Sequence, residues 1–388
     1  MNIIIFEDQL ISNLKPFSLN HASFEVKTGM LSNLDRFKIA FSNDHLHFIV
    51  RNEIEDVLSD RYPDLSINPN EIPEGYCING SIVWNDEYNH LLDEGSSDNN
   101  LIFYNNHKDI TVDNFFNLES FGSELKNKSN LDKIDYLWDA IDFFPKKMND
   151  DFNFLKVDKN YKFSTSSYFV SKEKISIDES VVVKPGCIFD ATKGPIVIKE
   201  NSVIDIGSKI QGPVYIDKDV FVSSGAKIKS GTLIGPGCKV GGEISNTIFH
   251  AYSNKVHDGF LGHSYVGEWV NIGAGTNNSN LKNNYSSIKF TFKDKTFDTN
   301  RIFLGSMIGD FTRIGISSML NTGTYIGIGS NIFGGDFQKI YIKSFSWGKD
   351  SRVDFNKFID TCIKMKKRRN EHLSDNEKEL LEKLYNSF

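Results

Sequence analysis

Aliphatic residues recur at every sixth position through the middle of the chain. An α-helix would repeat them every three or four residues and a β-strand every second residue, so neither element explains this spacing. A period of six indicates a parallel β-helix, in which each hexapeptide forms one short face and one corner. The positions are Ile177, Val183, Phe189, Ile204, Ile210, Ile216, Val222, Ile228, Ile234 and Val240, and later Ile302, Ile308, Ile314, Leu320, Ile326 and Ile332.

The repeat has two irregular segments. It is loose over residues 243–255 and is lost over residues 277–301, which we expect to leave the coil as a loop or arm on its binding face. Elsewhere a glycine often follows the aliphatic residue, as in Ile308–Gly309. Glycine suits a corner because it tolerates positive φ and close backbone approach. At about 18 residues per three-sided coil, the array predicts roughly eight coils.

The two ends of the chain have other patterns. Residues 1–165 alternate short apolar runs with helical periodicity, which predicts an α/β layer domain before a β-helix over residues 170–345. The tail, residues 346–388, is predicted to be helical. The expected strands are Ile3–Phe6, His45–Val50, Cys77–Trp84 and Leu101–Tyr104, and the expected helices are Met30–Phe37, Glu53–Leu58 and most of Val112–Phe154. The tail has an apolar stripe at Phe355, Phe358, Ile359, Cys362 and Ile363, and a capping box at Ser374–Glu377.

Composition excludes several classes of function. A net charge of -7 over 388 residues argues against a general nucleic-acid binder. We find no apolar run near the roughly 18 residues of a membrane span, and the N-terminus lacks the basic region of a signal peptide. The four cysteines are scattered without a CxxC pair, so we expect no zinc site or disulfide. These features predict a cytoplasmic protein.

The repeat changes character over residues 257–280, where polar residues and a Gly-Ala-Gly turn gather. The segments His257–Gly262, Val266–Gly267 and Asn271–Thr276 resemble the acetyltransferase domain of the bifunctional sugar-1-phosphate nucleotidylyltransferase/acetyltransferases. Tyr252–Lys255 and the residues around Trp269 look closest to the archaeal and Bacteroidetes-type branch. The resemblance is dense from about 235 to 340. It implies a left-handed β-helix, a homotrimer with active sites between subunits, and acetyl-CoA as cosubstrate.

The resemblance assigns roles in catalysis and coenzyme binding. His257 falls on the catalytic histidine, and Asn280 falls on the asparagine that binds the sugar and helps to orient the reaction. Gly273 and Ala274 fall on the turn along the acyl-CoA arm, and Ser306 falls on a coenzyme-contacting serine. A histidine suits the role of base because its unperturbed pKa, about 6.5, is near neutral pH.

Four further residues are candidates for substrate binding. Phe260 replaces a tyrosine of the family's site, and Lys289 matches a lysine of the insertion. Lys255 beside His257 either meets a phosphate or is solvated. Asn271 is either a substrate contact or a structural ladder residue.

Other interpretations of this stretch remain open. His257 is otherwise an ordinary corner residue. His250, His257 and His263 also permit a metal site assembled by a trimer, as in γ-class carbonic anhydrases, although the surrounding residues match acetyltransferases and we expect no metal there. The basic run over residues 364–369 is either a solvated helix face or a contact for an acidic group such as a nucleotide phosphate.

The N-terminal domain resembles the divergent nucleotidyltransferase-like domains of Bacteroidetes-type relatives through Phe17–Gly29. His21–Ala22 stands where those relatives usually have Arg-Pro, and Ile3–Leu10 contains no glycine for a phosphate cradle. The leading hypothesis is therefore a CoA-dependent acetyltransferase acting on an amino-sugar phosphate or nucleotide-sugar precursor. The alternatives are a sugar-1-phosphate nucleotidyltransferase using UTP or dTTP, with Mg²⁺, and a non-catalytic trimeric scaffold or ligand-binding protein.

Overall fold

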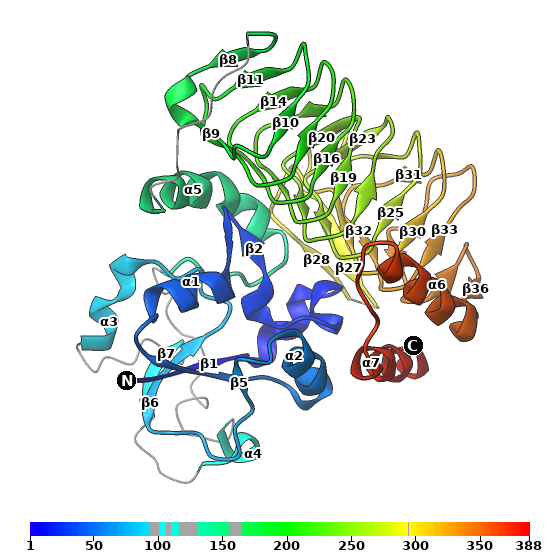
Figure 1. The fold of residues 1–388 in the computed structure, drawn as a ribbon. Coiled ribbons are helices and arrows are strands. Elements are labelled where there is room, and N and C mark those ends of the chain that lie inside the picture. Colours follow the sequence, from blue (N-terminus) through cyan, green and yellow to red (C-terminus); the bar gives the residue numbers. More distant parts are fainter. Residues whose placement is uncertain (94–100, 106–109, 116–130, 156–164, 294) are drawn as a thin grey trace.

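The N-terminal domain is built on a five-stranded sheet (Figure 1). The computed structural model describes residues 1–93, 101–105, 110–115, 131–155, 165–293 and 295–388. The sheet order is β5 (Ser66–Ile67), β4 (His45–Ile49), β1 (Asn2–Phe6), β6 (Gly75–Asn79) and β7 (Ile102–Asn105). Only β7 is antiparallel to its neighbour. Residues 3–6 of β1 are all fully buried, as expected for a central parallel strand covered on both faces.

The predicted α/β organisation is confirmed, with shifted boundaries. The helices are α1 (Asn33–Ala40), α2 (Glu55–Arg61), α3 (His90–Asp93), α4 (Val112–Phe115) and α5 (Asp139–Phe154). Helix α1 begins three residues later than predicted because Ser32 caps it, its Oγ accepting from the Asp35 N–H at 3.1 Å. The hairpin of β2 (Lys27–Thr28) and β3 (Leu31–Ser32) takes up the preceding residues. Residues 116–130 of the predicted helical stretch lie outside the described residues.

The middle of the chain is a parallel β-helix with three faces. The ten-stranded face contains β10 (Val182–Val183), β13 (Val203–Ile204), β16 (Phe221–Val222), β19 (Lys239–Val240), β22 (Asn254–Lys255), β25 (Asn271–Ile272), β30 (Arg313–Ile314), β33 (Asn331–Ile332), β35 (Ser346–Trp347) and the antiparallel β36 (Ser351–Arg352). The six-stranded face contains β8 (Tyr168–Val170), β11 (Ile188–Asp190), β14 (Lys209–Gln211), β17 (Lys227–Ile228), β20 (Glu243–Ser245) and β23 (Phe260–Gly262). The nine-stranded face contains β9 (Ile175–Ile177), β12 (Ile196–Ile198), β15 (Val214–Ile216), β18 (Thr232–Ile234), β21 (Ile248–Phe249), β24 (Tyr265–Val266), β29 (Ser306–Ile308), β32 (Thr324–Ile326) and β34 (Tyr341–Ile342).

The six-residue pattern corresponds to the interior of this coil. Most of the repeated aliphatic residues form one buried cluster along the axis. Two corrections concern the second block. Ile302 is 49% exposed, so the repeat resumes at Ile308. The coil also continues through β26 (Asn277–Asn278), which pairs with β31 (Met319–Leu320), so the insertion begins after residue 278.

The insertion forms an arm over the nine-stranded face. Strands β27 (Lys289–Phe292) and β28 (Lys295–Asp298) make an antiparallel hairpin. The Phe290 ring lies 4.9 Å from Trp138, and the Phe292 ring lies 5.1 Å from Tyr325, as centroid distances. The arm therefore packs on residues of its own chain.

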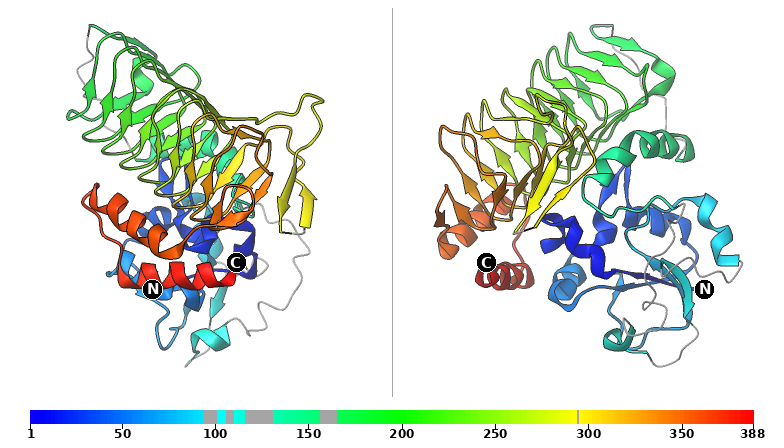
Figure 2. Two further views of the ribbon diagram at one scale, coloured as in Figure 1. Left: turned by 90° about the vertical axis from the view of Figure 1, so that its right-hand side faces the viewer. Right: turned by 180° about the vertical axis from the view of Figure 1, so that it is seen from behind.

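The N-terminal domain docks on the nine-stranded face (Figure 2). The central residues of these strands point outward, yet they are buried together with residues of the N-terminal domain and α5. They include Val197, Tyr215, Leu233, Tyr265, Met307 and Tyr325. Their partners include Leu14, Phe17, Val26, Trp138, Phe144 and Met148. The β-helix and the N-terminal domain thus share one apolar core.

The tail returns to the N-terminal domain through two helices, α6 (Phe355–Lys367) and α7 (Asp375–Ser387). Helix α6 packs Phe358 against Phe311 and Phe345 of the β-helix, and α7 contacts α2. The predicted cap of α7 is confirmed, because Ser374 Oγ accepts from the Glu377 N–H at 3.1 Å. No helix in the described part of the chain has the length and hydropathy of a membrane span.

Candidate functional site

His257 lies on an edge of the β-helix where the ten-stranded face meets the six-stranded face. Residues 257–259 connect β22 to β23, and residues 273–275 make the equivalent turn one coil later. The Gly275 N–H donates to the Asp258 carbonyl at 2.9 Å, so the two turns stack directly. A Cβ on Gly259 would lie 2.2 Å from the Thr276 carbonyl oxygen, which explains the glycine there. We call the stacked turns 257–259, 273–275 and 315–317 the His257 edge.

The His257 edge is open to solvent. His257, Asp258 and Gly275 are exposed, and Gly273 and Ala274 are half-buried. The Ala274 carbonyl accepts from the Ser317 N–H at 2.7 Å, which continues the stack into the next coil. The structure therefore brings the predicted base and the Gly-Ala-Gly turn to one accessible surface.

Lys255 does not reach that surface. It pairs in register with Val240, a residue of the coil interior, and only 1% of Lys255 is exposed. Its Nζ donates to the His257 carbonyl at 2.8 Å. Burial lowers its pKa to about 8, opposed by the Asp258 carboxylate. Both predicted roles for Lys255, phosphate binding and a solvated side chain, are wrong, because the side chain points into the coil. Its contact is with the backbone of the His257 turn.

Ser306 is also enclosed. It begins β29 and alternates with the outward-facing Met307, so its hydroxyl lies inside the coil and none of the residue is exposed. Its N–H donates to Ser264 Oγ at 2.9 Å. Ser306 therefore does not lie beside the Gly-Ala-Gly turn. The predicted contact with the coenzyme is wrong, because this residue packs inside the coil.

Asn280 lies on a different edge, where the six-stranded face meets the nine-stranded face. Its Nδ2 donates to His263 Nδ1 at 2.8 Å. The His263 ring stacks on Phe303 with centroids 5.0 Å apart. Burial lowers the pKa of His263, opposed by Asp142, so the ring is held neutral. Sequence reasoning considered His263 only as a metal ligand. The separation of 17 residues from Asn280, about one coil, was the signal for this contact.

The remaining substrate candidates are dispersed. The Phe260 ring and the Asn280 amide both approach Gly262, since a Cβ built there would lie 2.5 Å from the ring and 2.7 Å from Nδ2. Asn271 is exposed on β25 and pairs in register with Asn254, as the ladder interpretation predicts. Lys289 is exposed on the arm, opposite Asp298 in the hairpin.

The three histidines of the metal alternative do not converge within one chain. His257 and His263 lie on the two edges described above, and His250 is buried beneath the N-terminal domain. A potential metal cluster in the described residues is instead His21, His250 and Glu268. His250 already uses both ring nitrogens, Nδ1 with Glu268 at 2.9 Å and Nε2 with the Glu25 carbonyl at 3.1 Å. These contacts make the cluster part of an ion-pair network between the domains.

His21 and Asp310 connect the two domains within this network. His21 Nε2 lies 2.8 Å from an Asp310 carboxylate oxygen, with both side chains buried. Burial is the largest influence on His21 and lowers its pKa, and Arg61 lowers it too, but Asp310 and Glu25 together raise the pKa to about 9. Glu25 is also buried, yet Arg61 and His21 hold its pKa well below the usual range. At neutral pH His21 is therefore protonated and Glu25 is ionised.

The carboxyl edge of the N-terminal sheet is where an open α/β sheet binds ligands. Here Glu7 follows β1 and forms a two-oxygen ion pair with Arg51 Nη1, at 2.8 and 2.9 Å. Asp8 accepts from Asn79 Nδ2 at 2.7 Å and lies 3.4 Å from Lys133 Nζ. Burial raises the pKa of Glu7, and Arg51 opposes the shift. The carboxylates of Glu7 and Asp8 and the amine of Lys133 therefore lie at this edge. Arg51 is already paired with Glu7.

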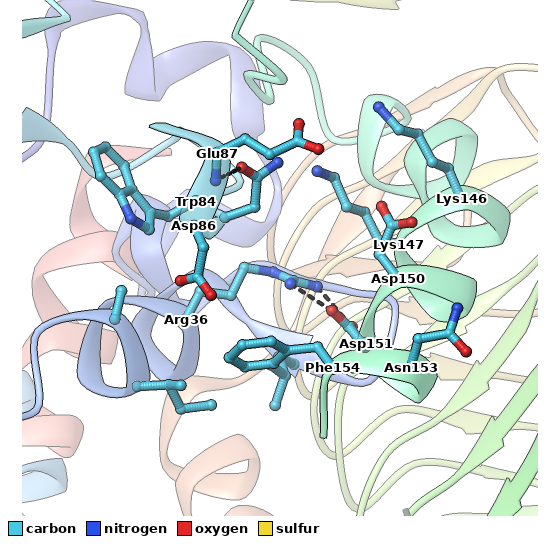
Figure 3. Close-up of a pocket in the computed structure, with 14 residues that line it drawn as sticks. Arg36, Trp84, Asp86, Glu87, Lys146, Lys147, Asp150, Asp151, Asn153 and Phe154 are labelled. Carbon is cyan, nitrogen blue, oxygen red and sulfur yellow. Dashed lines mark hydrogen bonds and ion pairs between the residues drawn. The ribbon is translucent and has the colours of Figure 1, made fainter. Parts of the chain in front are cut away.

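A cavity of about 550 Å³ lies between α1, α5 and residues 84–87 (Figure 3). Arg36 and Asp151 form a two-point ion pair in its wall, at 2.6 and 2.8 Å. Lys147 Nζ lies 2.7 Å from an Asp132 oxygen. None of the predicted site residues lines this cavity, and its two most buried cations are neutralised by the chain itself.

Comparisons with known proteins agree with both parts of the fold. Residues 3–160 match the family model of sugar nucleotidyl transferases. The chain is 29% identical over 242 residues to the bifunctional protein GlmU of Wigglesworthia glossinidia brevipalpis, covering 51% of each chain. It is 27% identical over 119 residues to the bifunctional sugar-1-phosphate nucleotidylyltransferase/acetyltransferase of Sulfurisphaera tokodaii, covering 30% of each. The predicted resemblance is therefore confirmed.

The matches are partial. The chain spans about half, or less, of the length of these curated relatives. Among solved structures, the UDP-N-acetylglucosamine acyltransferase of Francisella novicida aligns over 58% of this chain and 86% of its own, at 14% identity and a TM-score of 0.30.

Proposed function

We propose that this protein is an acyltransferase that moves an acyl group from a coenzyme A thioester to the amine of a sugar phosphate or nucleotide-sugar precursor. The observation that carries the proposal is the His257 edge. There an exposed imidazole and a Gly-Ala-Gly turn stand one coil apart on a solvent-facing surface, joined by the Gly275–Asp258 hydrogen bond. The similarity to bifunctional nucleotidylyltransferase/acetyltransferases supports the same reaction class.

The chemistry needs a base, an oxyanion donor and alignment of the two substrates. His257 takes the proton as the substrate nitrogen attacks the thioester carbonyl carbon. The carbon–sulfur bond then breaks, and the proton passes to the departing thiolate. A base of this kind typically contributes about 10²–10⁴ in rate.

The oxyanion donor in this proposal is the backbone N–H of Ala274. The Gly273 N–H donates to the Ile314 carbonyl at 2.8 Å, and the Gly275 N–H donates to Asp258. Both are therefore committed to stacking the coils. Among the hydrogen bonds of the described residues, the Ala274 N–H takes part in none. Of the three N–H groups in this turn, the one of Ala274 is therefore left to donate to the developing negative charge.

A homotrimer completes the proposal. Within one chain, His257 and Asn280 lie on edges at opposite sides of the six-stranded face. One subunit therefore does not place the proposed base beside the asparagine expected to orient the sugar. A neighbouring subunit that presents its own Asn280 edge to the His257 edge would join them.

The direct test is acetyl-CoA turnover with glucosamine-1-phosphate. We expect His257→Ala to lose about 10²-fold or more in kcat, as removal of a general base does. His372→Ala, which removes an exposed histidine of the tail, is the matched control and should retain full activity. Full activity in His257→Ala would exclude this residue as the base. A stable trimer inactive with every acceptor tried would favour the scaffold alternative.

A second activity is favoured by the match of residues 3–160 to sugar nucleotidyl transferases. The proposed site is the carboxyl edge of the N-terminal sheet, where Asp8 is positioned by Asn79 and Lys133. Carboxylates at this edge fit Mg²⁺, which would neutralise charge on the transferred phosphates. The test is release of pyrophosphate from UTP or dTTP with a sugar-1-phosphate and Mg²⁺, comparing wild type with Asp8→Asn. Release unchanged by Asp8→Asn would place any such reaction elsewhere.

A further inference from the structure

A basic groove lies between the ten-stranded face and α6. It encloses about 570 Å³, within the range of small-molecule sites, roughly 300–1,000 Å³. Four cationic side chains line it, Lys239 on β19, Arg313 on β30, and Arg368 and Arg369 at the end of α6. We call it the Arg313 groove.

The cations of the Arg313 groove are not neutralised by the chain. No Asp or Glu is among the described residues that line it. Arg369 donates to the Asn254 amide oxygen at 3.0 Å, and Arg313 Nη2 lies 2.9 Å from Met365 Sδ. Neither partner carries a charge. The acids whose charges act on Tyr252 are Glu371, which accepts from its hydroxyl at 2.9 Å, Glu268 and Asp219, and all three lie outside the lining.

Three of the four positive charges, Lys239, Arg368 and Arg369, repel one another. Partial burial lowers the pKa of Lys239, and Arg369 and Arg368 lower it further. Burial also lowers the pKa of Arg313. Holding like charges together is unfavourable unless an anion joins them. By contrast, the cations of the cavity in Figure 3 already have their carboxylates.

The groove also offers aromatic rings and amides beside its cations. The Tyr252 ring stacks on Trp269 with centroids 4.4 Å apart and planes 5° apart. The amides of Asn254 and Asn271 line the same groove. Arginines with aromatic rings and amides form the usual chemistry of sites for phosphates that carry a nucleoside.

The groove ends at the His257 edge. Val256, which directly precedes His257, and Asn271, which lies two residues before Gly273, both line the groove. We infer that the Arg313 groove binds the diphosphate of a nucleotide-bearing substrate whose reacting end lies at His257. The role of the groove in acyl transfer rests on the proposed function. Its binding of a diphosphate is argued from the residues of the groove alone. Two substrates share this chemistry, the coenzyme that carries the acyl group and a uridine-diphosphate sugar.

Calorimetric titration of the full chain tests the inference with three probes, inorganic pyrophosphate, coenzyme A and UDP. We expect pyrophosphate to bind and to be displaced by one of the two nucleotides, which identifies the source. Arg368→Glu and Lys239→Glu should each weaken binding at least tenfold. The matched control is Lys364→Glu, which makes the same charge change at an exposed position on α6 outside the lining. Thermal melts of each variant establish that it folds.

Three outcomes would overturn the inference. They are no binding of any probe, equal weakening in Lys364→Glu, and binding of pyrophosphate that neither nucleotide displaces. The fate of the proposed function is separate. His257→Ala should lower kcat about 10²-fold or more and leave nucleotide binding intact. Binding that survives without turnover in wild type would contradict the acyltransferase alone, and turnover unaffected by Arg368→Glu would contradict the groove alone.

Discussion

Asn280 donates a side-chain hydrogen bond to Nδ1 of His263 at 2.8 Å, from one coil to the next. With Nδ1 as the acceptor, the ring proton of His263 resides on Nε2. Burial lowers the pKa of this imidazole, so it remains a neutral acceptor near neutral pH, and its ring stacks on Phe303. His263 is therefore a positioning residue that fixes the orientation of the Asn280 amide.

The first prediction concerns this positioning. His263→Ala removes the acceptor and should lower kcat for acyl transfer about tenfold, with a smaller change in KM, because the Asn280 amide loses its fixed orientation. The matched variant is His263→Asn. Asparagine tolerates the positive φ of 48° at this position and supplies an acceptor oxygen, so it should restore most of the activity. Equal kcat in the alanine variant and wild type would remove His263 from the mechanism.

The second prediction concerns the His21–Asp310 contact. A histidine in the unfolded chain titrates near 6.5, whereas His21 in the folded chain has a pKa of about 9. The folded state thus binds more protons between these values. The stabilisation is fully present below about pH 6.5 and is lost as the pH rises through about 9.

We therefore expect wild type to lose stability relative to His21→Asn between pH 6.5 and pH 9.5. The size is on the order of 2–3 kcal/mol, since one pKa unit corresponds to about 1.4 kcal/mol. Urea unfolding of both proteins at the two pH values measures it. A constant difference between them would show that His21 does not gain a proton on folding.

The third prediction concerns the lysine inside the coil. The pKa of Lys255 is about 8 in the folded chain, against about 10.4 for an ordinary lysine, so the unfolded chain holds this proton more firmly. Stability from this group accordingly rises as the pH increases from about 8 to 10.4.

Lys255→Met should consequently stabilise the protein at pH 7 by on the order of 1–3 kcal/mol, because the buried charge is removed. The same variant loses the hydrogen bond to the His257 carbonyl, so acyl transfer should fall while stability rises. Parallel urea unfolding and turnover assays separate these effects. A variant that is less stable than wild type at pH 7 would contradict the charge argument.

The sequence was sufficient for the coil because its signal is local and repeated. Each inward aliphatic residue, such as Ile210 or Ile326, reports its own position. The same reasoning missed Lys255 and Ser306, which occupy inward positions without being aliphatic. A hydrophobic pattern assigns polar residues to the outside, and only the register with Val240 or the alternation with Met307 shows otherwise.

The contact between the domains could not be predicted from the sequence pattern, for a different reason. His21 and Asp310 are 289 residues apart, and no local period connects them. A weaker signal was present in the large outward residues of the nine-stranded face, Tyr215, Tyr265 and Tyr325, which a solvent-facing strand would not favour. They indicate a covered face, but not which part of the chain covers it.

The last prediction follows from the separation of His257 and Asn280 on two edges of one chain. If each site takes His257 from one subunit and Asn280 from the next, His257→Ala and Asn280→Ala subunits complement each other. Each variant alone should be inactive. Trimers formed by refolding an equal mixture contain interfaces where an intact His257 faces an intact Asn280 of the partner subunit. With random assembly about a quarter of the interfaces are intact, so about a quarter of wild-type turnover should return.

The control is a mixture of the same two variant trimers combined without unfolding and assayed at once, which should stay inactive because no mixed trimers have formed. Analytical ultracentrifugation of the refolded mixture verifies the trimer. Activity that fails to return in verified mixed trimers would mean that both residues act from the same chain. The two residues would then have to act across the six-stranded face of one chain, on whose opposite edges they lie.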